Sequence, residues 1–323
     1  MNCSLQDIAK RLKQAKRVAI ATHMRPDGDA LGSAFSLSCA LDFLGIANEV
    51  CVESLLPPQL SFIEGFQNVK KYPTSGYDLF VTVDCSEPHR LGILEDTFLS
   101  SLRKVDTINI DHHISNTRFA KYNFVRECAA NCMNMAQLIA YMGAPLNKKM
   151  AEYLAVGLMT DSGNFSHDDV TEETFLLAAK LAKAGVDIRS LNYNLFKKQS
   201  KARAALHALV MSGMRYYFDD RFAAIIITKE AMQRTGAGED MTEGFVDFPL
   251  NVDGVEVAAS LMEVKFRQYR VSLRTKTYAD ANAIAGRFGG GGHIRAAGCM
   301  LFGELEEVLG KLSFTVSQYL NTD

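Results

Sequence analysis

Short apolar stretches alternate with amphipathic ones along the first half of the chain. The runs at residues 18–22, 49–52, 79–84 and 107–111 are mainly apolar, as in strands of a parallel sheet covered on both faces. Between them, residues 4–15, 28–44, 134–141 and 148–159 carry apolar positions at helical spacing, and a glycine at position 45 is a good helix stop. Alternating strands and helices predict an α/β fold with a doubly wound, mainly parallel sheet.

The pattern changes after residue 161. Residues 172–184, 188–198 and 202–216 are predicted to be helical, residues 222–228, 255–264 and 269–275 to be strands, and residues 305–319 to form a last helix. We therefore expect a catalytic domain over residues 1–190, a helical linker over 191–216, and a smaller α/β domain with a mixed sheet over 217–323. A length of 323 residues is sufficient for two such cores.

The apolar segments of the first half share one feature, which is a His or Asp close after their C-terminal ends. Because the carboxyl ends of parallel strands open onto one crevice, these side chains are expected to converge there. In chain order they are His23, Asp27, Asp29, Asp84, Asp111, His112, His113 and Asp161.

Four carboxylates and two imidazoles of this set form a plausible pair of cation sites. Four carboxylates without cations would repel one another, and an oxygen-rich set suits Mn²⁺ or Mg²⁺ better than zinc. We expect Asp84 to bridge two ions. Gly28 should allow a turn that directs Asp27 and Asp29 to different ions, and the helix that starts there should offer N–H groups to a phosphate. The expected ligands are His23, Asp27, Asp29, Asp84, His112 and Asp161.

Each of these motifs alone is more often structural than functional, since Asp-Gly-Asp is a common turn and His-His pairs usually pack. Their coincidence favours the metal site. Asp111 is expected to accept a hydrogen bond from His112 and fix its tautomer. His113 is expected to contact the scissile phosphate as a proton donor or electrostatic stabiliser. For Cys85, beside Asp84, a buried core position is favoured over a reactive one.

A glycine-rich segment before residue 300 is the second strong signal. Consecutive glycines let the backbone approach a ligand and can point N–H groups at an anion. It lacks the Lys-Ser/Thr of a P-loop, and it follows a predicted helix, unlike a dinucleotide fingerprint; a plain surface turn is the alternative. Ser272 and Arg274 lie on one face of a predicted strand nearby. The candidate substrate-binding residues are Gly290, Gly291, Gly292, His293, Arg295, Ser272 and Arg274.

Charge supports an anionic ligand locally but not globally. The net charge of −2 gives no overall field for nucleic acid or membrane. Between residues 265 and 295, however, the only acid is Asp280, against seven basic residues: Lys265, Arg267, Arg270, Arg274, Lys276, Arg287 and Arg295. Seven scattered cysteines without a CxxC pair, no long apolar run and no leader-like N-terminus lead us to expect a cytoplasmic protein without a disulfide framework or membrane contact.

Together these motifs resemble the DHH phosphoesterases that carry a DHH-associated C-terminal domain. The length and motif order are similar to the bacterial bifunctional oligoribonuclease/PAP phosphatase (nanoRNase) type. The resemblance implies two Mn²⁺ ions, with Mg²⁺ as the substitute, and a hydroxide bridging them that attacks phosphorus. One ion would be held by His23, Asp27 and Asp84, and the other by Asp29, Asp84, His112 and Asp161.

The same resemblance implies hydrolysis of short oligoribonucleotides to 5′-mononucleotides and of adenosine 3′,5′-bisphosphate (pAp) to AMP. The glycine-His293 loop, Ser272 and Arg274 would hold the nucleotide, and Asn116 matches a family position near the phosphate. Asn131-Cys132 and Ser166-His167 depart from the family pattern. The departure at Ser166-His167 bears on which substrate is preferred and not on the metal site. A cyclic di-AMP or linear pApA phosphodiesterase remains the alternative enzyme, and a nucleotide sensor the non-enzymatic one. A homodimer is compatible with the sequence, which does not predict the oligomeric state.

Overall fold

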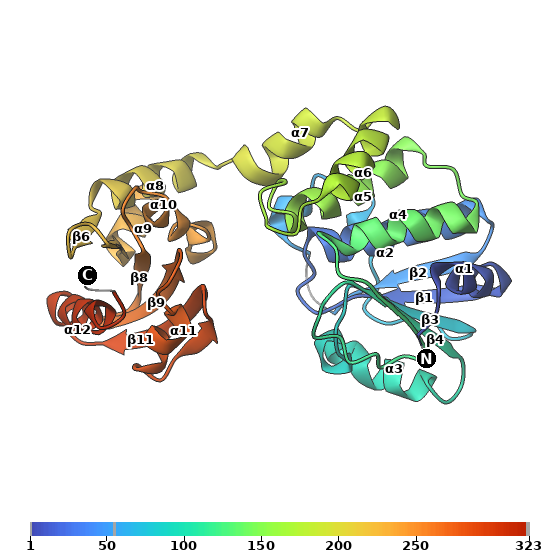
Figure 1. Ribbon diagram of the computed structural model, residues 1–323, viewed down its shortest axis with the longest axis horizontal. Coiled ribbons are helices and arrows are strands. Elements are labelled where there is room, and N and C mark those ends of the chain that lie inside the picture. Colours follow the sequence, from blue (N-terminus) through green and yellow to red (C-terminus); the bar gives the residue numbers. More distant parts are fainter. Residues whose placement is uncertain (1, 54–55, 321–323) are drawn as a thin grey trace. The chain divides into compact units, whose positions relative to one another are not determined.

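The computed structural model describes residues 2–53 and 56–320 and divides into two compact units, Met1–Lys198 and Gln199–Asp323 (Figure 1). The first unit contains a five-stranded sheet with the order β2-β1-β3-β4-β5. Every neighbouring pair in this sheet is parallel. Its strands are β1 (Arg17–Ala21), β2 (Ala47–Cys51), β3 (Leu79–Val83), β4 (Asp106–Asp111) and β5 (Tyr122–Val125).

The first sheet reverses its strand order between β1 and β3, because β2 lies on one side of β1 and the later strands on the other. Val81 of β3 pairs with Ile20 of β1 and with Ile108 of β4. In such a sheet the crevice at the carboxyl ends of the two strands beside the reversal is the usual ligand site. A ligand site is therefore expected among the residues that follow β1 and β3.

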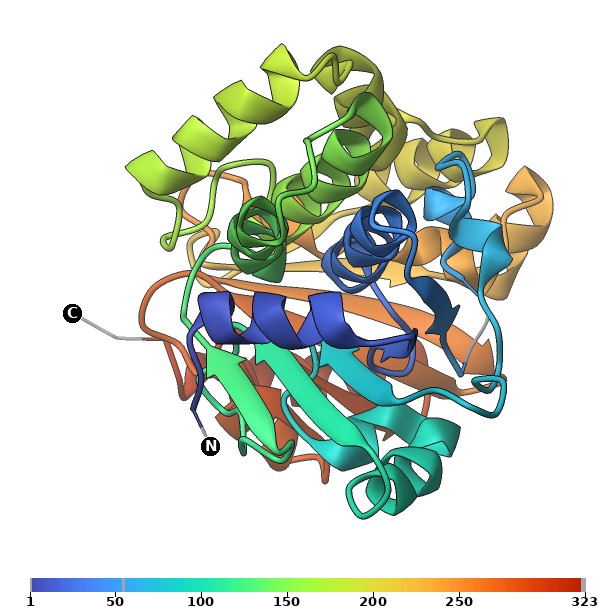
Figure 2. The ribbon, with the colours of Figure 1, turned by 90° about the vertical axis from the view of Figure 1, so that its right-hand side faces the viewer.

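Helices cover both faces of this sheet (Figures 1 and 2). One face packs against α1 (Leu5–Gln14), α2 (Gly28–Phe43), α4 (Asn131–Met142) and α5 (Lys148–Asp161), whose buried residues join the strands in the larger core. The other face packs against the 3₁₀ segment η3 (Pro88–Leu94) and α3 (Glu95–Ser101) through Leu91, Leu94 and Phe98. The unit ends with α6 (Glu172–Lys183), α7 (Ile188–Asn192) and a π-helical turn at Tyr193–Lys197.

Helices α2 and α5 lie unusually close because glycines occupy their contact. A Cβ on Gly32 would lie 2.4 Å from the Tyr153 carbonyl oxygen. A Cβ on Gly157 would lie 2.3 Å from the Cys132 sulfur and 2.6 Å from a carboxylate oxygen of Asp29. These distances are shorter than real Cβ contacts, so side chains at these positions would separate the helices.

The second unit contains a mixed six-stranded sheet with the order β10-β11-β9-β8-β7-β6. Only the β7–β8 pair is parallel among the described pairs of this sheet. Its strands are β6 (Arg215–Tyr217), β7 (Phe222–Ile227), β8 (Val257–Lys265), β9 (Gln268–Thr275), β10 (Gly291–His293) and β11 (Ala296–Phe302). Its helices are α8 (Lys201–Ser212), α9 (Lys229–Thr235), α10 (Asp247–Leu250), α11 (Ala281–Gly286) and α12 (Leu305–Ser317).

The two faces of the second sheet are covered unequally. Helices α11 and α12 pack on one face, where Val271, Leu273 and Leu301 are buried. On the other face α8 and α9 pack with Ile225 and Met262, on β7 and β8. Burial therefore alternates along β9 and β11, with every second residue of each strand at least partly exposed. This alternation is typical of antiparallel strands with one solvent-facing side.

The predicted fold class is confirmed, including the mixed sheet of the smaller unit. The prediction of a helix over residues 202–216 is wrong at its end, because α8 stops at Ser212 and residues 215–217 pair with β7 as an edge strand. Gly213 supplies the stop. The sequence reading also missed short elements, namely β5, β10, β11, α3 and α9. Within the described residues no helix combines the length and apolarity needed to cross a bilayer.

Candidate metal centre and nucleotide-binding face

The strand ends of the first unit bring the predicted chemistry together. Asp84 directly follows β3 with a φ of 52°, a left-handed conformation that is strained for a residue other than glycine. Its N–H donates to the carbonyl of Ile110 at 3.0 Å, so the neighbouring strand β4 holds it there. His23 follows β1 by two residues, and Asp161 ends α5. The ends of β1, β3, β4 and α5 thus meet at the reversal of the sheet.

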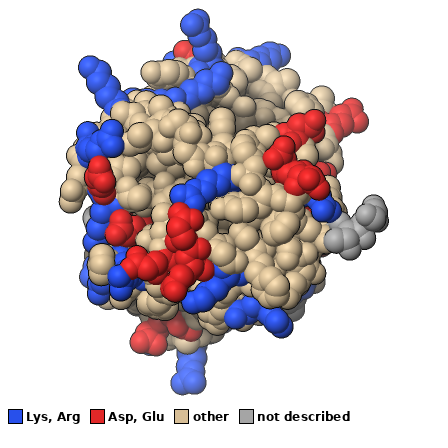
Figure 3. All heavy atoms as spheres, turned by 90° about the vertical axis from the view of Figure 1, so that its left-hand side faces the viewer, with Lys and Arg blue, Asp and Glu red and all other residues tan. Residues whose placement is uncertain are grey.

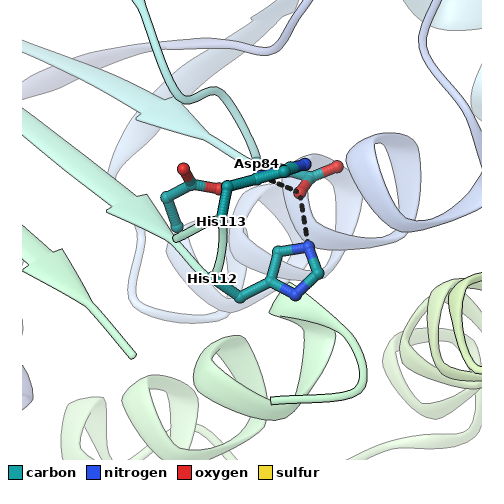
Figure 4. A group of neighbouring side chains, drawn as sticks. Asp84, His112 and His113 are labelled. Carbon is teal, nitrogen blue, oxygen red and sulfur yellow. Dashed lines mark hydrogen bonds and ion pairs between the residues drawn. The ribbon is translucent and has the colours of Figure 1, made fainter. Parts of the chain in front are cut away.

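Asp84 is the centre of this cluster (Figure 4). Its oxygen Oδ1 lies 3.4 Å from Nε2 of His112 and 3.7 Å from Nδ1 of His113, and its Oδ2 lies 3.6 Å from Nε2 of His23. The side chain is 2 % exposed, yet its Oδ1 accepts no well-formed hydrogen bond. A buried carboxylate oxygen without a donor is costly unless a cation compensates it.

Three groups of ligand-type atoms lie at or beside Asp84, each with its members within 4.8 Å of one another, and one of them is Asp84, Asp111, His112 and His113. Of the other two, the first is His23, Asp27 and Asp84. The second is Asp29, His112 and Asp161, and Nε2 of His112 lies 3.4 Å from both Asp84 and Asp161. The structure therefore brings all six predicted ligands into one place, together with Asp111 and His113, and their division between two ions stays a prediction. Oxygen donors outnumber imidazoles, as hard divalent cations prefer.

The Asp27-Gly28-Asp29 turn is held by helix termini. Oδ1 of Asp27 accepts from the N–H groups of Asp29 and Ala30, each at 3.0 Å, and so caps α2 itself. The prediction that these N–H groups are free for a phosphate is wrong. The Asp29 carboxylate accepts from the N–H groups of Asn131 and Cys132, at 2.5 and 2.9 Å, at the start of α4. The sequence reading missed this contact, since the partners lie about a hundred positions away.

Asp111 is bonded to a different histidine from the one predicted. Its Oδ1 accepts from Nδ1 of His113 at 2.8 Å, whereas Nδ1 of His112 donates to the carbonyl of Cys128 at 2.8 Å. The prediction that Asp111 orients His112 is wrong, because the backbone carbonyl of Cys128 takes the Nδ1 hydrogen bond of His112. Asn116 is buried, and its amide donates to Oδ2 of Asp111 at 2.6 Å. In this conformation Asn116 supports Asp111 instead of presenting its amide to solvent.

The protein alone does not balance the charges of this cluster. Burial, together with the charges of Asp84 and Asp161, raises the pKa of Asp29 well above its usual range. Burial raises the pKa of Asp161 to about 6. Burial would lower the pKa of His112, but its contacts with Asp84 and the charge of Asp29 raise it to about 10. Additional positive charge is therefore needed to stabilise all the carboxylates in their ionised form, and divalent cations would supply it.

Cys85 is a core thiol, as favoured from the sequence. It is fully buried and donates to the carbonyl of Glu87 at 3.2 Å. Burial raises the pKa of this thiol to about 12, which leaves no reactive thiolate near neutral pH. None of the seven cysteines is in a disulfide.

In the second unit, strand pairing places the predicted substrate-binding residues on one face. His293 pairs with Ala296, which in turn pairs with Arg274. On the next rung Gly291 pairs with Gly298, and Gly298 with Ser272. Directly paired residues of antiparallel strands point to the same side. The side chains of His293, Arg274 and Ser272 therefore lie on the open face, over a floor of two glycines.

The glycines are required mainly for close backbone packing. A Cβ on Gly290 would lie 2.2 Å from the carbonyl oxygen of Gly298, and one on Gly292 would lie 2.4 Å from that of Ala296. The N–H of Gly290 donates to the carbonyl of Ala285, and that of Gly292 to Oδ1 of Asn282 at 2.8 Å. The expectation that these two N–H groups point at an anion is wrong.

Several polar residues that the sequence did not predict hold the glycine loop and Arg274 in place. Asn282 holds the glycine loop, and Asp247 of α10 lies 3.4 Å from Nε of Arg274. Arg295 donates to the carbonyls of Thr277 and Ala279, so its guanidinium anchors the loop before α11. Asn and Asp are common in turns, and no local sequence pattern distinguishes Asn282 or Asp247 as a functional residue.

The chain resembles known proteins over nearly its whole length. Residues 17–158 match the DHH family N-terminal domain, and residues 223–322 match the DHHA1 domain. The bifunctional oligoribonuclease and PAP phosphatase NrnA of Thermus thermophilus is 32 % identical over 88 % of this chain and 84 % of its own length. The protein of the same name from Bacillus subtilis is 24 % identical over 91 % and 93 %.

Solved structures agree with this fold. An exopolyphosphatase-related protein from Bacteroides fragilis superimposes with a TM-score of 0.85 at 26 % identity, covering 98 % of this chain and 96 % of that one. An exonuclease RecJ bound to manganese superimposes with a TM-score of 0.50 at 17 % identity, covering 98 % and 94 %, and shares the fold alone.

Proposed function

The chain belongs to the DHH family of phosphoesterases, with a DHHA1 domain after the DHH domain, and from this premise we propose its substrates. We propose that it hydrolyses short oligoribonucleotides to 5′-mononucleotides and pAp to AMP. The support is the whole-length similarity to relatives named for these two activities.

We propose further that two Mn²⁺ ions serve the reaction, with Mg²⁺ as the substitute. His23, Asp27 and Asp84 would hold one ion, and Asp29, Asp84, His112 and Asp161 the other. The buried Oδ1 of Asp84, which accepts no well-formed hydrogen bond, is the observation that supports a bridging role. Bound ions would activate water and neutralise the phosphate's charge in the transition state.

His113 is the proposed proton donor to the leaving oxygen. Its hydrogen bond to Asp111 raises the pKa of His113 above the ordinary value, although burial opposes this. The imidazole therefore stays protonated to a higher pH than a free histidine, which suits a general acid. Asn116 contributes indirectly by fixing Asp111.

We assign metal chemistry to residues 1–190, the linker to residues 191–216 and nucleotide binding to residues 217–323. Arg274 would contact a phosphate, and His293 and Ser272 would contact the nucleotide beside it. Gly290, Gly291 and Gly292 would shape the floor, with Arg295 holding the adjoining loop. The support is the strand register, which places these side chains on one open face.

A turnover panel with Mn²⁺ tests the proposal. It would compare di- to pentaribonucleotides, pAp, cyclic di-AMP and linear pApA. We expect turnover of the short oligoribonucleotides and pAp. Asp84→Ala should lower turnover of every substrate more than about a hundredfold, because both ions lose a ligand. Asp96→Ala, an exposed aspartate on α3, is the matched control and should behave as the parent.

Each other outcome of the panel has a definite meaning. Turnover confined to cyclic di-AMP or linear pApA would replace the proposed substrates with that alternative. Nucleotide binding without turnover of anything would indicate a sensor protein. Near-normal turnover by Asp84→Ala would contradict the proposal that Asp84 bridges two ions.

A further inference from the structure

The open face of the second sheet extends beyond the residues assigned to nucleotide binding. Strands β9 and β11 are paired from Arg274 opposite Ala296 to Gln268 opposite Phe302. After the rung of Ser272 and Gly298 come Arg270 opposite Met300 and then Gln268 opposite Phe302. Rungs two residues apart are about 7 Å apart along a strand. The open face thus continues for about 13 Å past Ser272.

Side chains on these outer rungs are exposed although large and apolar. Phe302 is 61 % exposed and Met300 is 37 % exposed. Their strand neighbours Leu301 and Cys299 are buried under the helices of the opposite face. The exposure of Phe302 therefore does not reflect a frayed strand, since β11 is paired with β9 along its whole length.

The chemistry of this face suits a polyanion with aromatic rings. Strands β9 and β11 carry Arg270 and Arg274 and no acidic residue. Arg270 is half exposed, and Nη2 lies 3.3 Å from a carboxylate oxygen of Glu239, in an exposed ion pair that contributes little and that a phosphate can replace. On the side of the molecule drawn in Figure 3, acidic and basic side chains are interspersed.

We infer that the outer rungs form a second subsite for single-stranded RNA, in which Arg270 binds a phosphate and a base stacks on Phe302 beside Met300. Single-strand binding sites combine basic residues along the backbone with aromatic platforms for the bases. Gly291 and Gly298 lack side chains, so the sugar–phosphate chain can lie against the sheet between the two subsites. This inference rests on the proposed function and deepens it, because it explains how nucleotides beyond the first are held.

The experiment measures kcat and KM of the full chain with Mn²⁺ on pAp and on di-, tri- and pentaribonucleotides. Phe302→Ala should raise KM for the pentanucleotide about tenfold, the usual loss for one stacked base, and KM for pAp less than about twofold. Arg270→Ala should act in the same length-dependent way and weaken the salt dependence of the pentanucleotide KM. Phe314→Ala is the matched control, since Phe314 is 68 % exposed on α12, which packs on the other face of the sheet.

The outcomes separate the subsite from the proposed function. If the parent enzyme hydrolyses all lengths and Phe302→Ala changes them equally or not at all, the subsite is rejected and the function stands. If the parent hydrolyses no oligoribonucleotide, the proposed function is rejected and the subsite with it. If Phe302→Ala instead changes the oligomeric state in light scattering, the face is an interface between two copies of the chain, which also overturns the RNA subsite.

Discussion

At the scale of single residues, Asp84 illustrates how the candidate centre differs from an ordinary core. Its backbone is left-handed, its carboxylate is buried, and one oxygen has no donor. Burial would raise its pKa, but the contacts with His112 and His23 more than offset this and hold it below its usual range. The imidazoles of His112 and His23 thus keep this carboxylate ionised. Such strain is typical of functional sites.

Metal binding should release protons. His112 has its pKa raised to about 10, so it is protonated at pH 8 and must lose about one proton to become a ligand. Apparent Mn²⁺ affinity should therefore rise with pH up to about 10. Calorimetry at pH 8 in buffers with different protonation enthalpies measures the release, and His112→Gln should reduce it by about one proton while His89→Gln, at an exposed site, should not change it. Binding enthalpies independent of the buffer would contradict this assignment.

At the scale of elements, glycines and helix termini connect the fold to the site. The start of α4 donates two N–H groups to Asp29, and α2 and α5 approach closely enough to hold that contact. In the second unit, the Glu256 carboxylate accepts from the N–H groups of Thr277, Tyr278 and Ala279 and so shapes the loop before α11. Positioning of functional residues therefore depends on contacts between elements distant in sequence.

Gly32→Ala should destabilise the protein by about 1–3 kcal/mol, because its methyl group would collide with the Tyr153 carbonyl and separate α2 from α5. Gly310→Ala is the matched control. It lies within α12 with no atom within 4 Å of the added Cβ, so it should stabilise the protein by about 0.5–1 kcal/mol. Urea denaturation measures both. Equal stability of the two variants would show that α2 and α5 tolerate wider spacing.

Glu256 should contribute pH-dependent stability. Burial would raise its pKa, but the hydrogen bonds from Ala279 and Thr277 lower it below the ordinary value. A lowered pKa means that the stabilisation is fully present above the unfolded-state pKa and is lost as pH falls through the folded-state value. Glu256→Gln should cost about 2 kcal/mol at pH 7 and progressively less in acid. Denaturation midpoints of parent and variant that differ by the same amount at pH 7 and in acid would argue against this role.

At the scale of the whole molecule, the two units have separate cores and separate candidate chemistry. The side chains that could hold cations lie within the first unit. The open basic face lies within the second. Substitutions in the first unit should therefore change metal binding, and substitutions on the open face of the second unit should change substrate binding without changing metal binding.

Arg274→Ala should leave the number and affinity of bound Mn²⁺ ions unchanged but raise KM for oligoribonucleotides at least tenfold, because a charged contact to phosphate is lost. Arg234→Ala, on α9 and largely exposed, is the matched control and should alter neither quantity. Metal titration and steady-state kinetics together check the prediction. A weakened metal affinity in Arg274→Ala would mean that the two units do not act separately.

Local sequence patterns were sufficient to predict the α/β class, the mixed sheet of the smaller unit and the six ligand-type residues that cluster. This was possible because mainly apolar runs and the His or Asp at their ends are local patterns, and parallel strands bring such ends together. Such patterns could not identify short elements such as β10 and β11, since three to seven residues rich in glycine and alanine carry little periodic signal.

The hydrogen-bond and strand partners of these residues are defined by the folded chain and could not be predicted from local patterns. Asp111 orients His113 and not His112, Asp29 receives the N–H groups of α4, and strand register places His293, Arg274 and Phe302 on one face. Each of these facts depends on pairing between residues far apart in the chain. Hydrogen bonds are short and directional, so a one-residue change in register would reverse which side chains meet, and no local pattern specifies that register.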